Sequence, residues 1–243
     1  MSKTKDAGTA AVATITSSRR GPRTDIDTRA LIVDTSERLF GDATIDAVSM
    51  RAVAREAGLG TRAVTYHFPS KRDLVAAVLH RRLPVMAQAT TDGLAALIER
   101  RAAPSVRDVV DAMLDPYVQL LRDDPRGALR WIKVFNQLAL TEDPIWTDEF
   151  GVEPSFPDLF LAAAARALPD ISDVKVQRRA AIAMYSMTTM LASADHAAYG
   201  QPLGPGGLDP EWVEQLAIFT TAGLLGRTDR PRTAPQRAGR KSS

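Results

Sequence analysis

Several residue types and patterns are scarce in this sequence of 243 residues. It has no cysteine, which excludes disulfides, thiol nucleophiles and thiolate metal sites. Its three histidines, His67, His80 and His196, do not have the four-residue helical spacing of paired metal ligands. The most apolar window, residues 180–194, is shorter than the roughly 18 to 20 residues that cross a bilayer. We therefore expect a cytoplasmic protein with no metal or other cofactor.

Charge is unevenly distributed along the chain, although the net charge is only +2. Residues 1–82 contain 14 Lys and Arg against 9 Asp and Glu, residues 83–226 contain 11 against 19, and residues 227–243 contain 6 against 1. A basic head and a basic tail thus flank an acidic body. This asymmetry suggests that the head meets a polyanion, although charge alone is equally compatible with a solvated surface.

Composition divides the chain into four parts. Residues 1–24 mix small polar residues with Lys and Arg and are predicted to form a flexible basic arm. Residues 227–243 contain five arginines and almost no apolar residue, so they cannot offset the entropy of ordering and are predicted to be a disordered basic tail. The composition leaves open whether the basic arm and the basic tail contact a polyanion such as DNA or remain unbound. Residues 25–82 and 83–226 are the two folded parts.

Nearly every hydrophobic pattern in these folded parts has helical period and strand-like alternation is scarce, so the predicted fold class is all-α. Capping residues set several boundaries: Ser49 opens a helix, and capping boxes pair Ser70 with Asp73 and Ser105 with Asp108. Pro84 is expected to interrupt or kink a helix. Irregular segments are expected around 141–156 and 200–209. Later helices are predicted at residues 85–101, 106–122, 126–140, 157–168, 173–199 and 210–225.

Residues 49–68, SMRAVAREAGLGTRAVTYHF, have the spacing of a helix-turn-helix. A short helix over 50–57 ends at Gly58, a residue that enters a left-handed turn at little cost. Thr61 is predicted to cap a second short helix over 62–67. A helix of this length does not persist alone in water, so it must be held by packing against its neighbours.

The second short helix has two chemically different sides. Val64 and Phe68 are four residues apart and form an apolar seam with the preceding helix, which directs Arg62, Thr65 and Tyr66 to the opposite side. An arginine that forks onto guanine or phosphate, together with hydroxyl groups for phosphate oxygens, suits nucleic acid. Two-helix turns also occur in α-helical cores that bind nothing, so spacing alone leaves a purely structural role open.

The stretch TRALIVDTSERLF, followed by SMRAVAREAGLGTRAVTYHFPSKRDLV, closely resembles the N-terminal DNA-binding domain of TetR-family transcriptional regulators. The resemblance covers about residues 28–80 and includes Leu39-Phe40, Ala57-Gly58-Leu59, Tyr66-His67-Phe68 and the start of the next helix, Ser70 to Leu74. It implies a three-helix DNA-binding domain containing the helix-turn-helix, followed by a larger helical domain for ligand binding and dimerisation. The implied partners are a double-stranded DNA operator, a small-molecule effector and a second copy of the chain.

Carried over position by position, the resemblance implies a set of DNA contacts. The chain departs from the family pattern at Thr65, where the family often has Tyr, and at Gly60, where Ser is common. Affinity would then depend more on the basic arm, in which Lys3, Lys5, Arg19, Arg20 and Arg23 lie. The implied DNA-binding residues are Ser49, Arg51, Gly60, Thr61, Arg62, Ala63, Thr65, Tyr66, His67 and Lys71.

The acidic body contains no recognisable catalytic motif, so an enzyme is the weakest hypothesis. It does contain methionine and aromatic residues among the helices where TetR-like proteins place a ligand pocket, and such side chains suit an apolar effector. A stripe of these residues at helical spacing is also typical of an ordinary core. The candidate effector-binding residues are Met113, Tyr117, Trp131, Phe135, Trp146, Phe150, Met184 and Met187.

The last two predicted helices resemble the pair that forms an intersubunit four-helix bundle in the family. Their expected dimer-facing residues are Ala180, Ala181, Ala183, Met187, Leu191, Ala194, Trp212, Leu216, Phe219 and Leu224. The function we predict is a homodimeric transcriptional repressor that a small apolar effector releases from an inverted-repeat operator. Two alternatives remain: an architectural or division-controlling DNA-binding protein of the same fold without an effector, and a small-molecule binder or enzyme whose helical pair is only structural.

Overall fold

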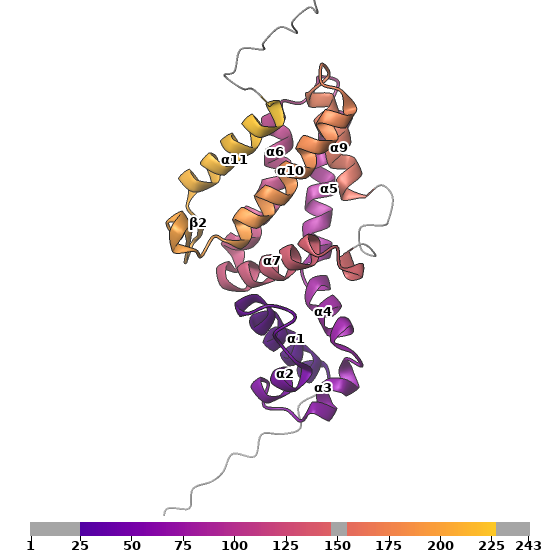
Figure 1. Cartoon of the computed structure of the whole chain (residues 1–243), viewed down its shortest axis with the longest axis vertical. Helices are drawn as coiled ribbons and strands as arrows, with labels where there is room; N and C mark the ends of the chain where they lie inside the picture. The colour runs from indigo at the N-terminus through magenta and orange to yellow at the C-terminus, as the bar shows by residue number, and fades with distance from the viewer. Residues whose placement is uncertain (1–24, 147–154, 227–243) are drawn as a thin grey trace, which may run out of the picture.

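The computed structural model describes residues 25–146 and 155–226, and within these ranges the chain is almost entirely helical. Four helices form the head at one end of the elongated molecule, and the other helices form the body (Figure 1). The head consists of α1 (Asp25–Asp42), α2 (Met50–Glu56), α3 (Thr61–His67) and α4 (Lys71–His80). The body consists of α5 (Leu83–Glu99), α6 (Val106–Asp123), α7 (Pro125–Leu140), α9 (Phe156–Ala167), α10 (Asp173–Ala192) and α11 (Pro210–Leu225). The basic arm and basic tail lie outside the described residues, and no described helix combines the length and hydropathy needed to span a bilayer.

Side-chain caps define the helix starts much as the sequence predicts. The Ser49 hydroxyl accepts a hydrogen bond from the Ala52 N–H at 3.1 Å and begins α2. Both predicted capping boxes are present, at the starts of α4 and α6. The predicted cap at Thr61 is wrong: Gly60 is the N-cap of α3 and, having no side chain, forms no side-chain capping bond. Thr61 is already the first helical residue.

Pro84 interrupts the helical run as the sequence predicts: α4 ends at His80, and Pro84 lies in the first turn of α5, where its missing N–H has no partner to lose. Two further boundaries differ from the sequence-based expectation. Helix α10 ends at Ala192 instead of 199 and is followed by a short 3-10 turn, Ala197–Tyr199. Residues 203–208 form a small antiparallel hairpin of β1 (Leu203–Gly204) and β2 (Gly207–Leu208), which packs on α6. A two-residue strand is too short to produce a recognisable alternation.

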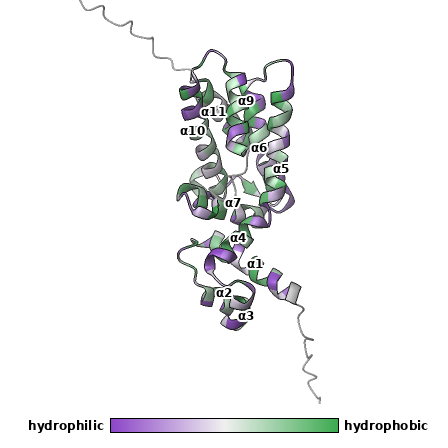
Figure 2. Ribbon diagram, turned by 90° about the vertical axis from the view of Figure 1, so that its right-hand side faces the viewer, coloured by the Kyte–Doolittle hydropathy of each residue, from purple (hydrophilic) through white to green (hydrophobic). Residues whose placement is uncertain are grey.

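Helix α7 joins the head to the body. It lies across the junction between the head and the upright body helices (Figures 1 and 2), and α1 packs along it. Polar contacts add to this packing: the Arg130 guanidinium forms a two-pronged ion pair with Asp42 at 2.8 and 3.0 Å, and the Gln137 side chain accepts from the Ile45 N–H at 2.9 Å. Helix α7 is therefore buried against the body on one side and contacts the head on the other.

Candidate nucleic-acid interface and effector pocket

A glycine turn positions α3 against α2. Gly58 has φ +67°, in the left-handed region that the sequence predicts for it. The N–H of Leu59 donates to the Ala54 carbonyl at 2.9 Å and that of Gly58 donates to the Arg55 carbonyl at 3.2 Å. These two bonds are the Schellman pattern, which satisfies the last carbonyl groups of α2 and turns the chain sharply into α3.

Packing fixes which side of α3 faces outward. Val64 is fully buried and Phe68 is 2% exposed, and both pack with Val53 and Ala54 as the sequence predicts. Tyr66, in contrast, is 72% exposed, and Arg62 and Thr65 are exposed beside it. The apolar seam therefore holds α3 so that its arginine-bearing side faces solvent.

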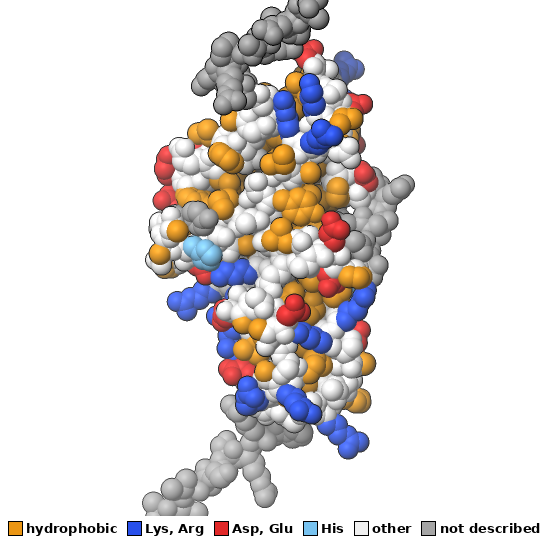
Figure 3. All heavy atoms as spheres, in the orientation of Figure 1, with side chains coloured by type: hydrophobic (Ala, Val, Ile, Leu, Met, Phe, Trp, Pro, Cys, Tyr) orange, Lys and Arg blue, Asp and Glu red, His pale blue; other side chains and the backbone are white. Residues whose placement is uncertain are grey.

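Three unpaired arginines lie close together on α2 and α3. Within the described part of the chain, Arg51, Arg55 and Arg62 are exposed and form no ion pair. Arginines near the junction are paired instead, for example Arg82 with Glu37 and Asp124. Lys and Arg side chains gather at the tip of the head (Figure 3). Such an uncompensated basic surface favours binding of a polyanion.

The sequence-based list omitted Arg55, although a signal for it exists. Arg55 follows Arg51 by four residues on α2, so the two side chains lie on one helix face. We add Arg55 to the candidate interface.

The ten predicted DNA-binding residues lie together on α2, α3 and the start of α4. Thr65 donates its hydroxyl to the Thr61 and Arg62 carbonyls at 3.2 Å, which leaves the oxygen able to accept. The Lys71 ammonium donates to the Asp46 carbonyl at 3.4 Å, and the rings of Tyr66 and His67 meet edge to face at 5.1 Å. The exposed members are Ser49, Arg51, Gly60, Thr61, Arg62, Thr65 and Tyr66, and the half-buried members are Ala63, His67 and Lys71.

Two small cavities lie between the body helices beside α7. The first, of about 20 Å³, and the second, of about 10 Å³, share Tyr117, Phe135 and Phe156 as common walls. The first is otherwise lined by Leu83, Met86, Ala87, Thr90 and Trp131, and the second by Ala139, Trp146, Met184, Tyr185 and Thr188. Each volume is enough for about one water molecule. A larger molecule enters only if these walls move apart.

The predicted effector-binding residues divide into three groups. Five of them line these cavities: Tyr117, Trp131, Phe135, Trp146 and Met184. Met113 and Met187 are buried but contribute to neither cavity, and Phe150 lies outside the described residues. The lining residues Leu83, Met86, Phe156 and Tyr185 were absent from the predicted set. Leu83 and Met86 come from α5, where the sequence has no aromatic cluster that would indicate a pocket.

The aromatic walls pack closely against one another. Trp131 stacks on Phe135 with ring centroids 5.2 Å apart, and Phe135 meets Trp146 edge to face at 4.6 Å. Tyr117 is 5% exposed, and burial raises the pKa of its phenol above the ordinary value of 10.0. This tyrosine is therefore a neutral hydroxyl group at physiological pH.

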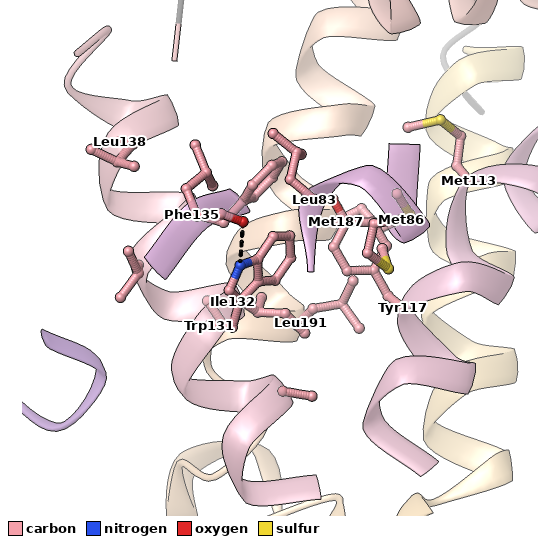
Figure 4. Packing of buried hydrophobic residues seen from close by; sticks show 14 of the residues in the cluster. Leu83, Met86, Met113, Tyr117, Trp131, Ile132, Phe135, Leu138, Met187 and Leu191 are labelled. Atoms are coloured by element: carbon pink, nitrogen blue, oxygen red, sulfur yellow. Dashed lines mark hydrogen bonds between the residues drawn. The ribbon is translucent and has the colours of Figure 1, made fainter. Parts of the chain in front are cut away.

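One hydrogen bond connects the cavity wall directly to the head. The indole N–H of Trp131 donates to the carbonyl of Leu79, in the last turn of α4, at 3.0 Å (Figure 4). The same side chain lines the first cavity and is fully buried. A displacement of Trp131 therefore acts on the carboxyl end of α4.

On α10 and α11, the side that faces solvent is not the side that the sequence predicted to face a second subunit. Ala180, Ala183, Met187, Leu191 and Ala194 on or just after α10 are buried within the chain's own core, as are Leu216 and Leu224 on α11. Apolar residues are exposed elsewhere on the same helices: Val174 at 57%, Ile182 at 67%, Ile218 at 47% and Phe219 at 69%. Of the expected residues, Phe219 and Ala181 do face outward. For most of the expected positions on these helices, the sequence pattern therefore indicated the side that packs inside the chain.

The fold and the exposed face of α3 define a helix-turn-helix regulator with a helical C-terminal domain. A model described as bacterial regulatory proteins, tetR family, matches residues 32–78, and a model described as tetracyclin repressor-like, C-terminal domain, matches residues 111–223. The chain belongs to the TetR family of transcriptional regulators and is a DNA-binding regulator.

Individual relatives agree with this assignment. The chain is 27% identical over 203 residues to the probable HTH-type transcriptional regulator ArpR of Pseudomonas putida, covering 83% of this chain and 80% of that protein. A TetR-like transcriptional regulator from Rhodococcus sp. RHA1 shares the fold with a TM-score of 0.55 at 16% identity, covering 86% of this chain and 100% of the other. The TetR family regulator PfmR from Thermus thermophilus aligns with a TM-score of 0.51 at 13% identity, covering 80% and 97%.

Proposed function

We propose that this protein is a homodimeric repressor whose affinity for an inverted-repeat operator is lowered by a small apolar effector. The observation that carries the DNA-binding part is the exposed side of α3, where Arg62, Thr65 and Tyr66 stand beside arginines that have no ion-pair partner among the described residues. The mode of action as a repressor is an expectation from the family.

Recognition would place α3 in the major groove, with the α2 arginines on the flanking phosphates. Arg62 is the side chain on α3 able to form a forked hydrogen bond with guanine. Lys71, at the start of α4, would contact a phosphate. Base contacts and phosphate contacts differ in their dependence on sequence and salt, so the two roles are separable by experiment.

The test uses operator fragments selected from genomic DNA and fluorescence anisotropy across a salt series. Arg62→Ala should lose about 1–3 kcal/mol of specific binding and discriminate less between operator variants. Lys71→Ala should weaken all sequences alike and reduce the salt slope by about 1. Arg101→Ala, which removes an exposed arginine in the loop between α5 and α6, is the matched control. Equal binding by all three variants would reject this interface.

Effector response is supported by the connection between cavity and head. A ligand that spreads the walls around Trp131 would strain its hydrogen bond to Leu79 and shift α4 relative to α7. The two heads of a dimer would then change separation and no longer fit one operator. To shift occupancy from 1:99 to 99:1, a ligand must favour one conformation by about 5.5 kcal/mol.

A second candidate function is DNA binding without any effector, and the small cavity volumes of about 20 and 10 Å³ favour it. A thermal-shift screen against neutral and charged metabolites separates the two functions. Under our proposal, compounds that raise the unfolding temperature also release DNA. A screen in which no compound does either would favour the effector-free function.

Dimerisation is supported by the exposed apolar side chains of α10 and α11. Exposed Ile182 and Phe219 are large apolar groups of the kind that a two-fold interface covers. Phe219→Asp should convert the dimer to a monomer in sedimentation velocity and abolish cooperative operator binding. Val85→Asp, at an equally exposed apolar residue on α5, should leave the dimer intact.

A further inference from the structure

The described lining of the two cavities carries no charge. It consists of apolar, aromatic and hydroxyl-bearing side chains from α5, α6, α7, α9 and α10, together with Trp146 from the segment after α7. A charged molecule placed there would lose its hydration without gaining an ion pair, and this costs several kcal/mol or more. The lining therefore selects against ionised ligands.

Three polar groups in this lining already have partners within the protein. The Thr90 hydroxyl donates to the Met86 carbonyl at 2.9 Å, and the Thr188 hydroxyl donates to the Met184 carbonyl at 3.0 Å. The Trp131 indole N–H donates to Leu79. These groups are occupied within the protein and have no proton left for a ligand.

Tyr117 and Tyr185 are the two phenols of the lining, and no hydrogen bond to either hydroxyl is found among the described residues. Tyr185 is half-buried and lines the second cavity alone. The Tyr117 side chain is 5% exposed and forms a wall of both cavities. It lies beside Leu83 and Met86 (Figure 4), so its immediate surroundings are apolar. A hydroxyl that borders a cavity without a protein partner gains a hydrogen bond when a ligand supplies an acceptor, and such a bond contributes about 0.5–1.5 kcal/mol.

We infer that Tyr117 is the specificity-determining polar contact of the effector site and that the effector is a neutral aromatic molecule with one carbonyl-type oxygen. The Tyr117 hydroxyl donates to that oxygen, while the ring of the ligand packs among Trp131, Phe135 and Phe156. The inference rests on the proposed effector function and adds the chemical class of the ligand. The two cavities share Tyr117, Phe135 and Phe156, so a ligand that displaces the Phe156 ring occupies both and keeps the Tyr117 contact.

The experiment compares three probes of similar shape: acetophenone, α-methylstyrene and benzoate. The first two differ by an oxygen in place of a methylene group, and benzoate adds a charge. Dissociation constants are measured by quenching of tryptophan fluorescence, since Trp131 and Trp146 line the cavities. The informative quantity is the ratio of the acetophenone constant to the α-methylstyrene constant, because it cancels the different hydration of the two probes when variants are compared.

In Tyr117→Phe, this ratio should shift about tenfold in favour of α-methylstyrene, which is the usual effect of losing one hydrogen bond to a buried group. In Thr188→Val, which removes a hydroxyl already bonded to its own helix, the ratio should not change. Tyr117→Phe should unfold at about the same urea concentration as the parent protein, because it breaks no hydrogen bond among the described residues. Benzoate should bind more weakly than either neutral probe.

An unchanged ratio in Tyr117→Phe, preferential binding of benzoate, or failure of both neutral probes to bind would overturn the inference. Operator release is measured separately with the same probes. If the Tyr117-dependent ratio is found without release of DNA, the ligand class stands and the proposed effector function fails. If charged compounds release DNA, the effector function stands and this ligand class is wrong.

Discussion

Gly41 lies at a close contact between the head and the body. It is the next-to-last residue of α1 and lies against Arg130 of α7. A Cβ atom added at Gly41 would lie 2.5 Å from the Arg130 Cβ and 2.7 Å from its Cα. These atoms cannot rotate away, because one belongs to the backbone and the guanidinium is held by Asp42. Gly41→Ala must therefore separate α1 from α7.

The size of the effect follows from two opposing terms. Overpacking of a closely packed contact costs about 1–3 kcal/mol, and replacing a helical glycine by alanine returns about 0.5–1 kcal/mol. We expect a net loss of about 1–2 kcal/mol in the free energy of unfolding. Gly93→Ala is the matched control, since its Cβ would lie 3.4 Å from the Ala112 Cβ, an ordinary contact. That variant should gain about 0.5–1 kcal/mol.

Urea unfolding at one fixed protein concentration measures both variants, because dimer stability depends on concentration. Operator affinity is measured alongside and should fall in Gly41→Ala alone, because the heads are then held at a different angle. If Gly41→Ala and Gly93→Ala had the same free energy of unfolding, α1 and α7 would not be rigidly packed at Gly41, and the expected loss of stability would be refuted.

Three further predictions concern the junction and the head. Burial raises the pKa of Asp124, but hydrogen bonds from Arg82 and the Gly127 N–H outweigh burial and hold this pKa below the ordinary value of 3.8. The ionised Asp124 therefore stabilises the folded state fully above pH 3.8, and this stabilisation is lost as the pH falls through the lower pKa of the folded state. The free energy of unfolding in urea should accordingly fall less steeply from about pH 5 to pH 2 in Asp124→Asn than in the parent protein. Equal slopes in the two proteins would contradict this assignment. Ser70→Ala removes the capping box of α4 and should cost about 1 kcal/mol in thermal or urea unfolding, whereas no loss would mean that Asp73 caps the helix alone. Trp131→Phe removes the hydrogen bond to Leu79 but keeps an aromatic wall, so effector and operator should each still bind while the effector-induced loss of operator affinity shrinks; full retention of that loss would exclude this route.

The head could be predicted from the sequence because its determinants are local. Gly58 needs only its own backbone freedom to adopt φ +67°, and the capping box of Ser70 and Asp73 lies within four residues. The exposed side of α3 follows from the positions of Val64 and Phe68, since a short helix with one apolar side has only one way to pack. Gly60 was the exception, because a cap one residue earlier is equally compatible with the local pattern.

The body depended on contacts between distant segments. The outward face of α10 was misassigned because alanine and methionine suit an internal core and a subunit interface equally well, and only the position of α7 and α11 decides which side is buried. The hydrogen bond from Trp131 to Leu79 joins residues 52 positions apart, and the cavities draw their walls from five helices. Periodicity determines that a helix has an apolar side, whereas the partner of that side is determined by packing of the whole chain.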